Sequence, residues 1–160
     1  MARNLLVRRS KIHGNGVFAA RDLPKGLRLI QYRGALRRHD EIDQCYGGDS
    51  ESGHTFLFTL NEDWVIDANV DGNSARWLNH SCVPNCEAIH YEDDADRSKD
   101  TVYIETVRAI REGEELTYDY GITLDEAHTA RMKKIWACRC GHRKCTGTML
   151  TPKTRSKSGA

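Results

Sequence analysis

The 160-residue sequence lacks any long hydrophobic run. No stretch approaches the roughly 20 apolar residues that cross a bilayer, and the opening MARNLLVRRS has no apolar stretch long enough for a secretory signal. We therefore expect no membrane association and a cytoplasmic location, with the nucleus or export to a host cell as alternatives. With 39% hydrophobic and 29% charged residues, the composition excludes disorder for most of the chain and fits one globular domain.

The sequence also lacks a net charge of one sign, because 24 Lys and Arg residues nearly balance 23 Asp and Glu residues. The balance conceals a pattern along the chain: residues 1–38 carry +9 (ten basic, one acidic), residues 39–126 carry −17 (five basic, 22 acidic) and residues 127–160 carry +9 (nine basic). Much of this charge is ordinary solvated surface. The acidic middle could also steer a cationic ligand, which favours a basic protein as partner, whereas a direct nucleic-acid binder would show a dominant positive charge.

Cysteine has the most informative spacing of any residue type here. Three of the six cysteines form a C-x-C-x4-C pattern: Cys138, Cys140 and Cys145. If the protein is not exported its thiols stay reduced, so clustered cysteines fit metal ligands better than disulfides, and a zinc site needs four ligands. Cys82 or Cys86 is the expected fourth donor, with His142 as a local competitor. The pattern therefore predicts a structural zinc site.

Short apolar runs and frequent turn signals predict a mostly β fold. We expect one or two helical turns at 72–80, and a longer helix at 125–135 because an acid lies near its start and two lysines near its end. The polar, basic tail at 151–160 should be frayed. Strands are expected in the following segments: 4–8, 15–20, 27–32, 54–60, 63–67, 86–91, 101–110 and the second half of 111–120.

Three separated segments carry most of the polar chemistry. HGNGVFA (13–19) contains a Gly-x-Gly turn, RWLNHSCVPNC (76–86) a polar cluster, and EELTYDYG (114–121) two tyrosines on one face of a strand. Taken singly, these are a hairpin turn, a satisfied buried histidine and two core aromatics. A Cys–His hydrolase built on His80 and Cys82 is disfavoured, because residues two apart beside a zinc knuckle make a poor dyad.

Together and in this order, the segments resemble the SET-domain protein-lysine methyltransferases, and the compact form is similar to bacterial members. The resemblance runs from Leu5 to Leu150 and includes the Tyr32-x-Gly34 element, the aromatic strand before VIDA and the C-x-C-x4-C knuckle. It implies a monomer with the mostly β SET-domain fold, built from several short-stranded sheets with short helices and a zinc-pinned C-terminal segment. The implied divisions are a SET domain at 1–124, a post-SET helix and zinc knuckle at 125–150, and a flexible tail at 151–160.

The resemblance also implies roles for individual residues. The implied methyl donor is S-adenosylmethionine, held by the backbone around Gly14, Asn15, Gly16 and Val17 and by Asn79, His80 and Tyr120. The implied catalytic tyrosines are Tyr32, Tyr118 and Tyr120, and the implied lining of the substrate channel is Tyr32, Phe58 and Tyr118. Tyr118 stands at the phenylalanine/tyrosine switch position, which implies mono-methylation. The implied zinc ligands are Cys82, Cys138, Cys140 and Cys145, whereas Cys86 is usually not a ligand.

The chemistry of lysine methylation agrees with these residue types. Free lysine has a pKa near 10.4, so only about one amine in a few thousand is neutral at pH 7. An aromatic channel disfavours the ammonium form, while tyrosine faces and hydroxyls can accept the cation and orient its nitrogen. Phe56 departs from the family's frequent tyrosine, and Ala35 from its frequent acid. Phe56 is the only sequence hint for the alternative, an inactive, zinc-stabilised SET-like interaction module, whereas Ala35 is structural drift. For the enzyme, we expect a basic protein such as a histone as substrate.

Overall fold

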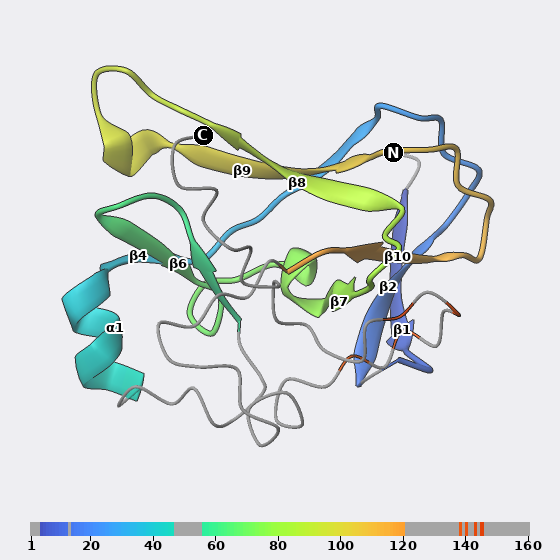
Figure 1. The fold of residues 1–160 in the computed structure, drawn as a ribbon, viewed down its shortest axis with the longest axis horizontal. Helices are drawn as coiled ribbons and strands as arrows, with labels where there is room; N and C mark the ends of the chain where they lie inside the picture. The colour runs from blue at the N-terminus through green and yellow to red at the C-terminus, as the bar shows by residue number, and fades with distance from the viewer. Residues whose placement is uncertain are drawn as a thin grey trace, which may run out of the picture.

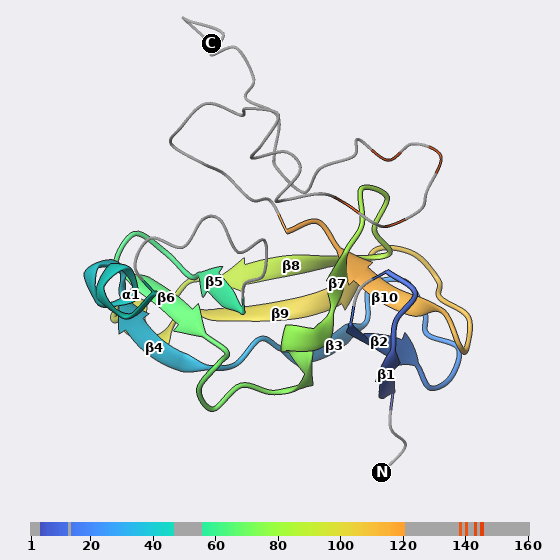
Figure 2. The ribbon, with the colours of Figure 1, turned by 90° about the horizontal axis from the view of Figure 1, so that it is seen from below.

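The computed structural model describes residues 4–12, 14–46 and 56–120, together with Cys138, Cys140, Arg143 and Cys145. Its strands form three small sheets, which confirms the mostly β fold expected from the sequence. Figures 1 and 2 show the long hairpin of β8 (Cys86–Tyr91) and β9 (Thr101–Thr106) along one side, with the other two sheets near its opposite ends. Among the described residues, no helix is long and apolar enough to cross a membrane.

The first sheet joins segments that are far apart in the sequence. Its order is β1-β2-β10-β7, with antiparallel pairing from β1 to β10 and a parallel contact between β10 and β7. The parallel contact sets Thr117 opposite Asn79 and Tyr118 opposite His80. The polar cluster and the tyrosine strand therefore lie side by side. The strands are β1 (Leu5–Arg9), β2 (Asn15–Ala19), β7 (Asn79–His80) and β10 (Glu115–Tyr118).

The second sheet has the order β3-β9-β8 and is built on the hairpin. Along β9, Val102, Ile104 and Thr106 are buried and alternate with partly exposed residues, as expected for a strand with one face on the core. β3 (Arg28–Gln31) pairs with the other edge of β9. The loop at the hairpin tip contains one 3-10 turn, η2 (Arg97–Lys99).

The third sheet has the order β4-β6-β5 and a close backbone approach at its start. A Cβ on Gly34 would lie 2.4 Å from the carbonyl oxygen of Asp67, so only glycine fits without a shift. Arg37 Nε donates to the buried Asp67 carboxylate at 2.9 Å. The elements are β4 (Ala35–Arg38), β5 (Leu57–Thr59), β6 (Trp64–Asp67) and, directly after β4, the helix α1 (His39–Tyr46).

One hydrophobic core connects the three sheets. It includes Val17 of β2, Ile66 of β6 and Ile104 of β9, and also the rings of Tyr32 and Tyr118. The short 3-10 helix η1 (Ser74–Trp77) precedes β7, and its cap residue Asn73 accepts a hydrogen bond from the Ala75 backbone N–H at 3.2 Å. Tyr118, the last residue of β10, and Tyr32, directly after β3, are thus held by the packed core.

Most of the expected strands are present, and the differences have clear causes. Sequence reasoning predicted neither β4 nor α1: the sequence ALRR of β4 has no apolar alternation, and its pairing depends on β6. The polar segment expected to form helical turns at 72–80 divides into η1 and the two-residue strand β7. The helix expected at 125–135 and the tail at 151–160 lie outside the described residues.

Candidate active site and metal centre

Four aromatic rings from three parts of the chain lie in one row, the aromatic row. Tyr32 follows β3, Phe58 lies in β5, Tyr118 is the last residue of β10, and Tyr120 lies two residues after it. Neighbouring ring centroids are 5.0 Å apart for Tyr32 and Phe58, 6.4 Å for Phe58 and Tyr118, and 4.9 Å for Tyr118 and Tyr120. The fold therefore brings together the three predicted catalytic tyrosines and the predicted channel residues, whose roles stay predictions.

The tyrosine hydroxyls of the aromatic row stay protonated at neutral pH. Burial raises the pKa of Tyr32, Tyr118 and Tyr120 well above its usual range, and the Asp67 carboxylate raises that of Tyr32 further. Among the described residues, the hydroxyls of Tyr32 and Tyr118 have no hydrogen-bond partner. These groups can therefore offer hydrogen bonds to an incoming amine, but they cannot act as phenolate bases.

Three contacts fix Tyr120 against the segment 78–80. Its hydroxyl donates to the Leu78 carbonyl oxygen, and its backbone N–H donates to Nδ1 of His80 at 3.0 Å. The two rings meet edge to face with centroids 5.4 Å apart. Burial lowers the pKa of His80, and the Asp119 carboxylate opposes this shift only in part, so the imidazole is neutral at pH 7. Tyr120 is therefore held at its hydroxyl, its ring and its backbone.

The Gly-x-Gly turn is joined to this site through Glu115. The Glu115 carboxylate accepts hydrogen bonds from the Ser10 hydroxyl at 2.7 and 2.8 Å and from the Asn79 side-chain amide at 2.9 Å. The same amide donates to the Asn15 carbonyl oxygen at 3.1 Å. A Cβ on Gly16 would lie 2.2 Å from the Glu115 carboxylate, so a glycine at this position leaves room for the carboxylate. We call the set of hydrogen bonds that Glu115 and Asn79 make between β1, β2, β7 and β10 the Glu115 buckle. The predicted cofactor residues of β2 and β7 are thus adjacent.

The remaining predicted cofactor residues have distinct environments. Gly14 has a φ of +46°, a left-handed conformation that glycine adopts readily. The Val17 side chain is fully buried in the core, so only its backbone could face a ligand. Sequence reasoning missed Ser10, Glu115 and Leu78. A signal existed for Glu115, which is a charged residue directly before the strand's apolar and aromatic positions, but Leu78 acts through its carbonyl group and leaves no side-chain signal.

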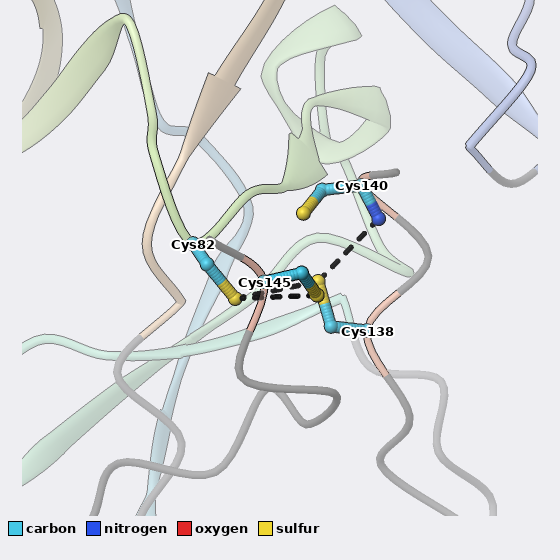
Figure 3. A group of neighbouring side chains, drawn as sticks. All are labelled: Cys82, Cys138, Cys140 and Cys145. Atoms are coloured by element: carbon cyan, nitrogen blue, oxygen red, sulfur yellow. Dashed lines mark hydrogen bonds between the residues drawn. The ribbon is translucent and has the colours of Figure 1, made fainter. Parts of the chain in front are cut away.

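Four cysteine sulfurs converge beside the segment that holds Tyr120 (Figure 3). The Sγ atoms of Cys82, Cys138, Cys140 and Cys145 all lie within 4.8 Å of one another. Cys82 Sγ is 3.6 Å from Cys138 Sγ and 3.8 Å from Cys145 Sγ. A tetrahedral zinc ion with bonds of about 2.3 Å separates its sulfur ligands by about 3.8 Å. The donor set and its spacing therefore fit zinc.

The alternatives for the fourth zinc donor can now be separated. Cys86 lies in the core with 1% exposure, apart from the four-cysteine group, and burial raises the pKa of its thiol to about 12. It is a packing residue, and Cys82 takes the fourth position instead. His142 lies outside the described residues.

Comparison with known proteins agrees with this geometry. The SET domain family model matches residues 14–121. Histone-lysine N-methyltransferase trr of Drosophila melanogaster is 40% identical over 145 residues, which cover 89% of this chain and 6% of trr. Histone-lysine N-methyltransferase 2B of Homo sapiens is 36% identical over 144 residues (87% of this chain, 5% of the relative). Histone-lysine N-methyltransferase, H3 lysine-4 specific, of Chaetomium globosum is 35% identical over 141 residues (87% and 12%).

The chain spans 12% or less of the length of these three relatives, so the similarity concerns one domain. The matched range contains the Gly-x-Gly turn, the polar cluster and the tyrosine strand, which the fold brings together at one site. Because the family model covers more than half of the sequence and these segments meet in the structure, the chain belongs to the SET-domain family.

Proposed function

We propose that this domain is a protein-lysine N-methyltransferase that uses S-adenosylmethionine and acts on a histone or another basic protein. The observation that carries the proposal is the aromatic row, which ends at a firmly held Tyr120 beside the Glu115 buckle. Buried and partly buried rings next to a Gly-x-Gly turn offer two adjoining environments, one for an alkyl-ammonium side chain and one for an amphiphilic cofactor. Relatives named as histone-lysine N-methyltransferases support this reading.

The residues around the Gly-x-Gly turn would hold the cofactor. Among the described residues, a Cβ at Gly14 would meet nothing within 4 Å, so a ligand has room to approach the backbone there, whereas Gly16 accommodates the Glu115 carboxylate. Asn79 of β7 contacts the turn at the Asn15 carbonyl oxygen. S-adenosylmethionine, when bound, supplies the methyl group as an electrophile. The four cysteines would hold a structural zinc ion, because all four positions of a tetrahedral site are filled by protein sulfur.

The aromatic row prepares the lysine amine for attack. Removal of water disfavours the ammonium form, so the row lowers the pKa of a lysine that enters it. Tyr32, Tyr118 and Tyr120 have raised pKa values and keep their own protons, so they cannot remove the proton from lysine. The amine therefore loses its proton to solvent, and the hydroxyls orient the nitrogen lone pair afterwards.

We further propose that mono-methylation is the main outcome. The Tyr118 ring lies between those of Phe58 and Tyr120 in the row, at centroid distances of 6.4 and 4.9 Å, so its hydroxyl stands close to the path of an incoming amine. A hydroxyl in this position competes for the space that a second or third methyl group on the amine needs. Tyr118→Phe should therefore raise the share of di- and trimethyl-lysine among the products, as measured by mass spectrometry.

Charge beside the row supports a basic substrate. Asp119 lies between the two tyrosines of β10 in sequence, and its side chain is 62% exposed. It belongs to the acidic segment 39–126, which carries a charge of −17. Exposed carboxylates near the mouth of a site raise the local concentration of cationic ligands. Lysine-rich protein tails have the matching charge.

The test uses methyl-labelled S-adenosylmethionine with purified histones and, separately, whole-cell extract. Wild type should label lysines, and Tyr120→Phe should lower the rate by about 100-fold, because the lost hydroxyl no longer fixes the site through Leu78. Tyr103→Phe is the matched control, because the Tyr103 ring lies on β9 and packs edge to face on Tyr91. This variant should label lysines at the wild-type rate.

Equal labelling by the Tyr120→Phe and Tyr103→Phe variants would contradict the assignment of Tyr120. Absent labelling together with absent cofactor binding, in zinc-loaded protein, would favour the interaction module instead. Phe56 is the residue behind that alternative; its ring packs edge to face on Trp77 with centroids 5.2 Å apart.

A further inference from the structure

His80 faces two different partners with its two ring nitrogens. Nδ1 lies 3.0 Å from the backbone nitrogen of Tyr120, and Nε2 lies 3.7 Å from Cys82 Sγ. The residue is 5% exposed, so the ring has little freedom to turn and little water to replace either contact. One imidazole therefore lies between the held tyrosine and a cysteine of the four-sulfur group.

The geometry selects one tautomer of this ring. A backbone N–H can only donate, so Nδ1 must present its lone pair to Tyr120, and the hydrogen of the neutral ring is then on Nε2. That hydrogen is directed to Cys82 Sγ, at a distance suited to a bond to sulfur. The Asp119 carboxylate also lies near Nδ1, but at 3.7 Å it is farther away than the Tyr120 N–H.

The chain segment between the two contacts is short. Leu78, whose carbonyl accepts the Tyr120 hydroxyl, and Cys82 are four residues apart, with His80 midway. Hydrogen bonds to a metal-binding side chain orient it and tune its affinity, typically by 10- to 100-fold. A hydrogen bond to the Tyr120 backbone fixes the end of β10. The same side chain thus performs both tasks.

We propose that His80 is a positioning residue that fixes the Cys82 thiolate relative to the Tyr120 backbone. Its Nε2–H donates to the Cys82 sulfur, and its Nδ1 accepts from the Tyr120 N–H. The inference rests on the proposed function only in taking Tyr120 as the active-site tyrosine. The consequence is that zinc affinity and the position of β10 depend on opposite edges of one ring. Substitutions that imitate only one edge should separate the two properties.

The first test uses the zinc-loaded wild-type protein and no variant. Nitrogen-15 NMR distinguishes the two neutral tautomers of a histidine ring, because a protonated and an unprotonated ring nitrogen have different shifts. We expect His80 as the Nε2–H tautomer, with Nδ1 unprotonated. A ring protonated on Nδ1 would overturn the proposal.

The second test compares His80→Asn with His80→Gln. The Asn oxygen can replace Nδ1 as acceptor for the Tyr120 N–H, whereas the Gln amide can replace Nε2 as donor to sulfur. We expect His80→Asn to weaken zinc binding about tenfold and to shift the thiolate charge-transfer band of the cobalt-loaded protein, while the Tyr120 amide stays protected from hydrogen exchange. We expect His80→Gln to keep zinc affinity within about twofold and to speed exchange at the Tyr120 amide about tenfold.

The matched control is the same pair of substitutions at His90, which bonds to Asp100 at the far end of the β8–β9 hairpin. Neither His90 variant should change zinc affinity or exchange at Tyr120. If each His80 variant loses both zinc affinity and protection of the Tyr120 amide, or if neither variant loses either, the two ring nitrogens do not act separately and the proposal is wrong. All readouts are taken without cofactor or turnover, so they stand even if the domain proves not to methylate lysine.

Discussion

Two polar networks organise the opposite ends of this domain, and the first is mostly local in sequence. At the tip of the β8–β9 hairpin, the buried Asp100 carboxylate accepts hydrogen bonds from the Asp93 backbone, His90 and Arg97, all within ten residues. Asn61 supplies a fourth bond from 39 residues away. We call this group the tip network. Most of it can form as soon as the hairpin turns.

The second network, at the site, joins residues that are far apart in sequence. The bond from Ser10 to Glu115 spans 105 residues, that from Asn79 to Asn15 spans 64, and that from Tyr120 to His80 spans 40. We call this group the site network. The complete network forms only when β2, β7 and β10 have come together.

This difference predicts how substitutions in each network should affect stability and catalysis. The tip network stabilises one loop, so its loss should affect stability with little effect on chemistry. The site network depends on the relative position of three strands, so a disturbance anywhere in it should move cofactor residues and Tyr120 together. Experiments that change one network and monitor the other test whether the two are independent.

Zinc removal should have the largest effect. Cys82 follows β7 directly, so loss of the ion releases the chain segment that holds His80 and Leu78. Because structural zinc binding is also folding energy, chelation should abolish S-adenosylmethionine binding and increase hydrogen exchange in β7 and β10. The backbone amides around the tip network, at residues 90–100, should exchange at an unchanged rate. Methyl transfer that continues unchanged after verified metal removal would show that the site does not depend on the cysteine group.

Truncation of Glu115 should have the next largest effect. Glu115→Ala leaves the Ser10 hydroxyl and the Asn79 amide without their shared acceptor, which should cost about 1–3 kcal/mol in the free energy of unfolding. Cofactor affinity, measured by calorimetry, should fall about tenfold because Asn15 and Asn79 shift.

The neighbouring residue offers a matched control for Glu115. Glu114 forms an ion pair with Arg108 at 2.9 Å, with half-exposed side chains. Glu114→Ala should cost less than about 1 kcal/mol and leave cofactor affinity unchanged. If both alanine variants lower cofactor affinity alike, the Glu115 buckle has no special part in shaping the pocket.

The comparison also explains what sequence could predict. Strand alternation and turn residues are local signals, so the β8–β9 hairpin and the β5–β6 pair could be predicted from residues alone. The family resemblance brought Tyr32, Phe58, Tyr118 and Tyr120 into one site before any coordinates, and their ring contacts confirm that they are neighbours.

What sequence could not predict depends on tertiary contact. β4 carries arginines where an amphipathic strand would alternate; it is held by its pairing with β6, whose buried Asp67 carboxylate accepts a hydrogen bond from Arg37. Ser10 and Glu115 look like ordinary polar residues until β1 and β10 flank β2. The choice of Cys82 over Cys86 likewise follows from direction: Cys86 begins β8 and faces the core, whereas Cys82 lies in the preceding turn.

The smallest expected effect concerns Asp100, and it separates stability from chemistry. Although burial raises the pKa of this carboxyl, hydrogen bonds from the Asp93 backbone, Asn61, Arg97 and His90 hold the pKa well below its usual range. A carboxyl with a depressed pKa stabilises the fold above its unfolded pKa of about 3.9, and this contribution is lost as the pH falls.

Asp100→Asn should therefore unfold more easily than wild type in urea at pH 7, and the gap should narrow below about pH 4, where the wild-type carboxylate begins to lose its advantage. Methyl transfer per folded molecule at pH 7 should not change, because within the described part of the chain no hydrogen bond or ion pair joins the tip network to the aromatic row or the cysteine group. A gap that stays constant with pH would show that the Asp100 charge does not stabilise the loop. A loss of turnover in folded protein would show instead that the two networks are coupled. The route of such coupling is the β8–β9 hairpin, which carries the tip network at one end and leads to the site at the other. Asn85, next to β8, donates to the Glu115 carbonyl oxygen and accepts from the Thr117 backbone N–H of β10.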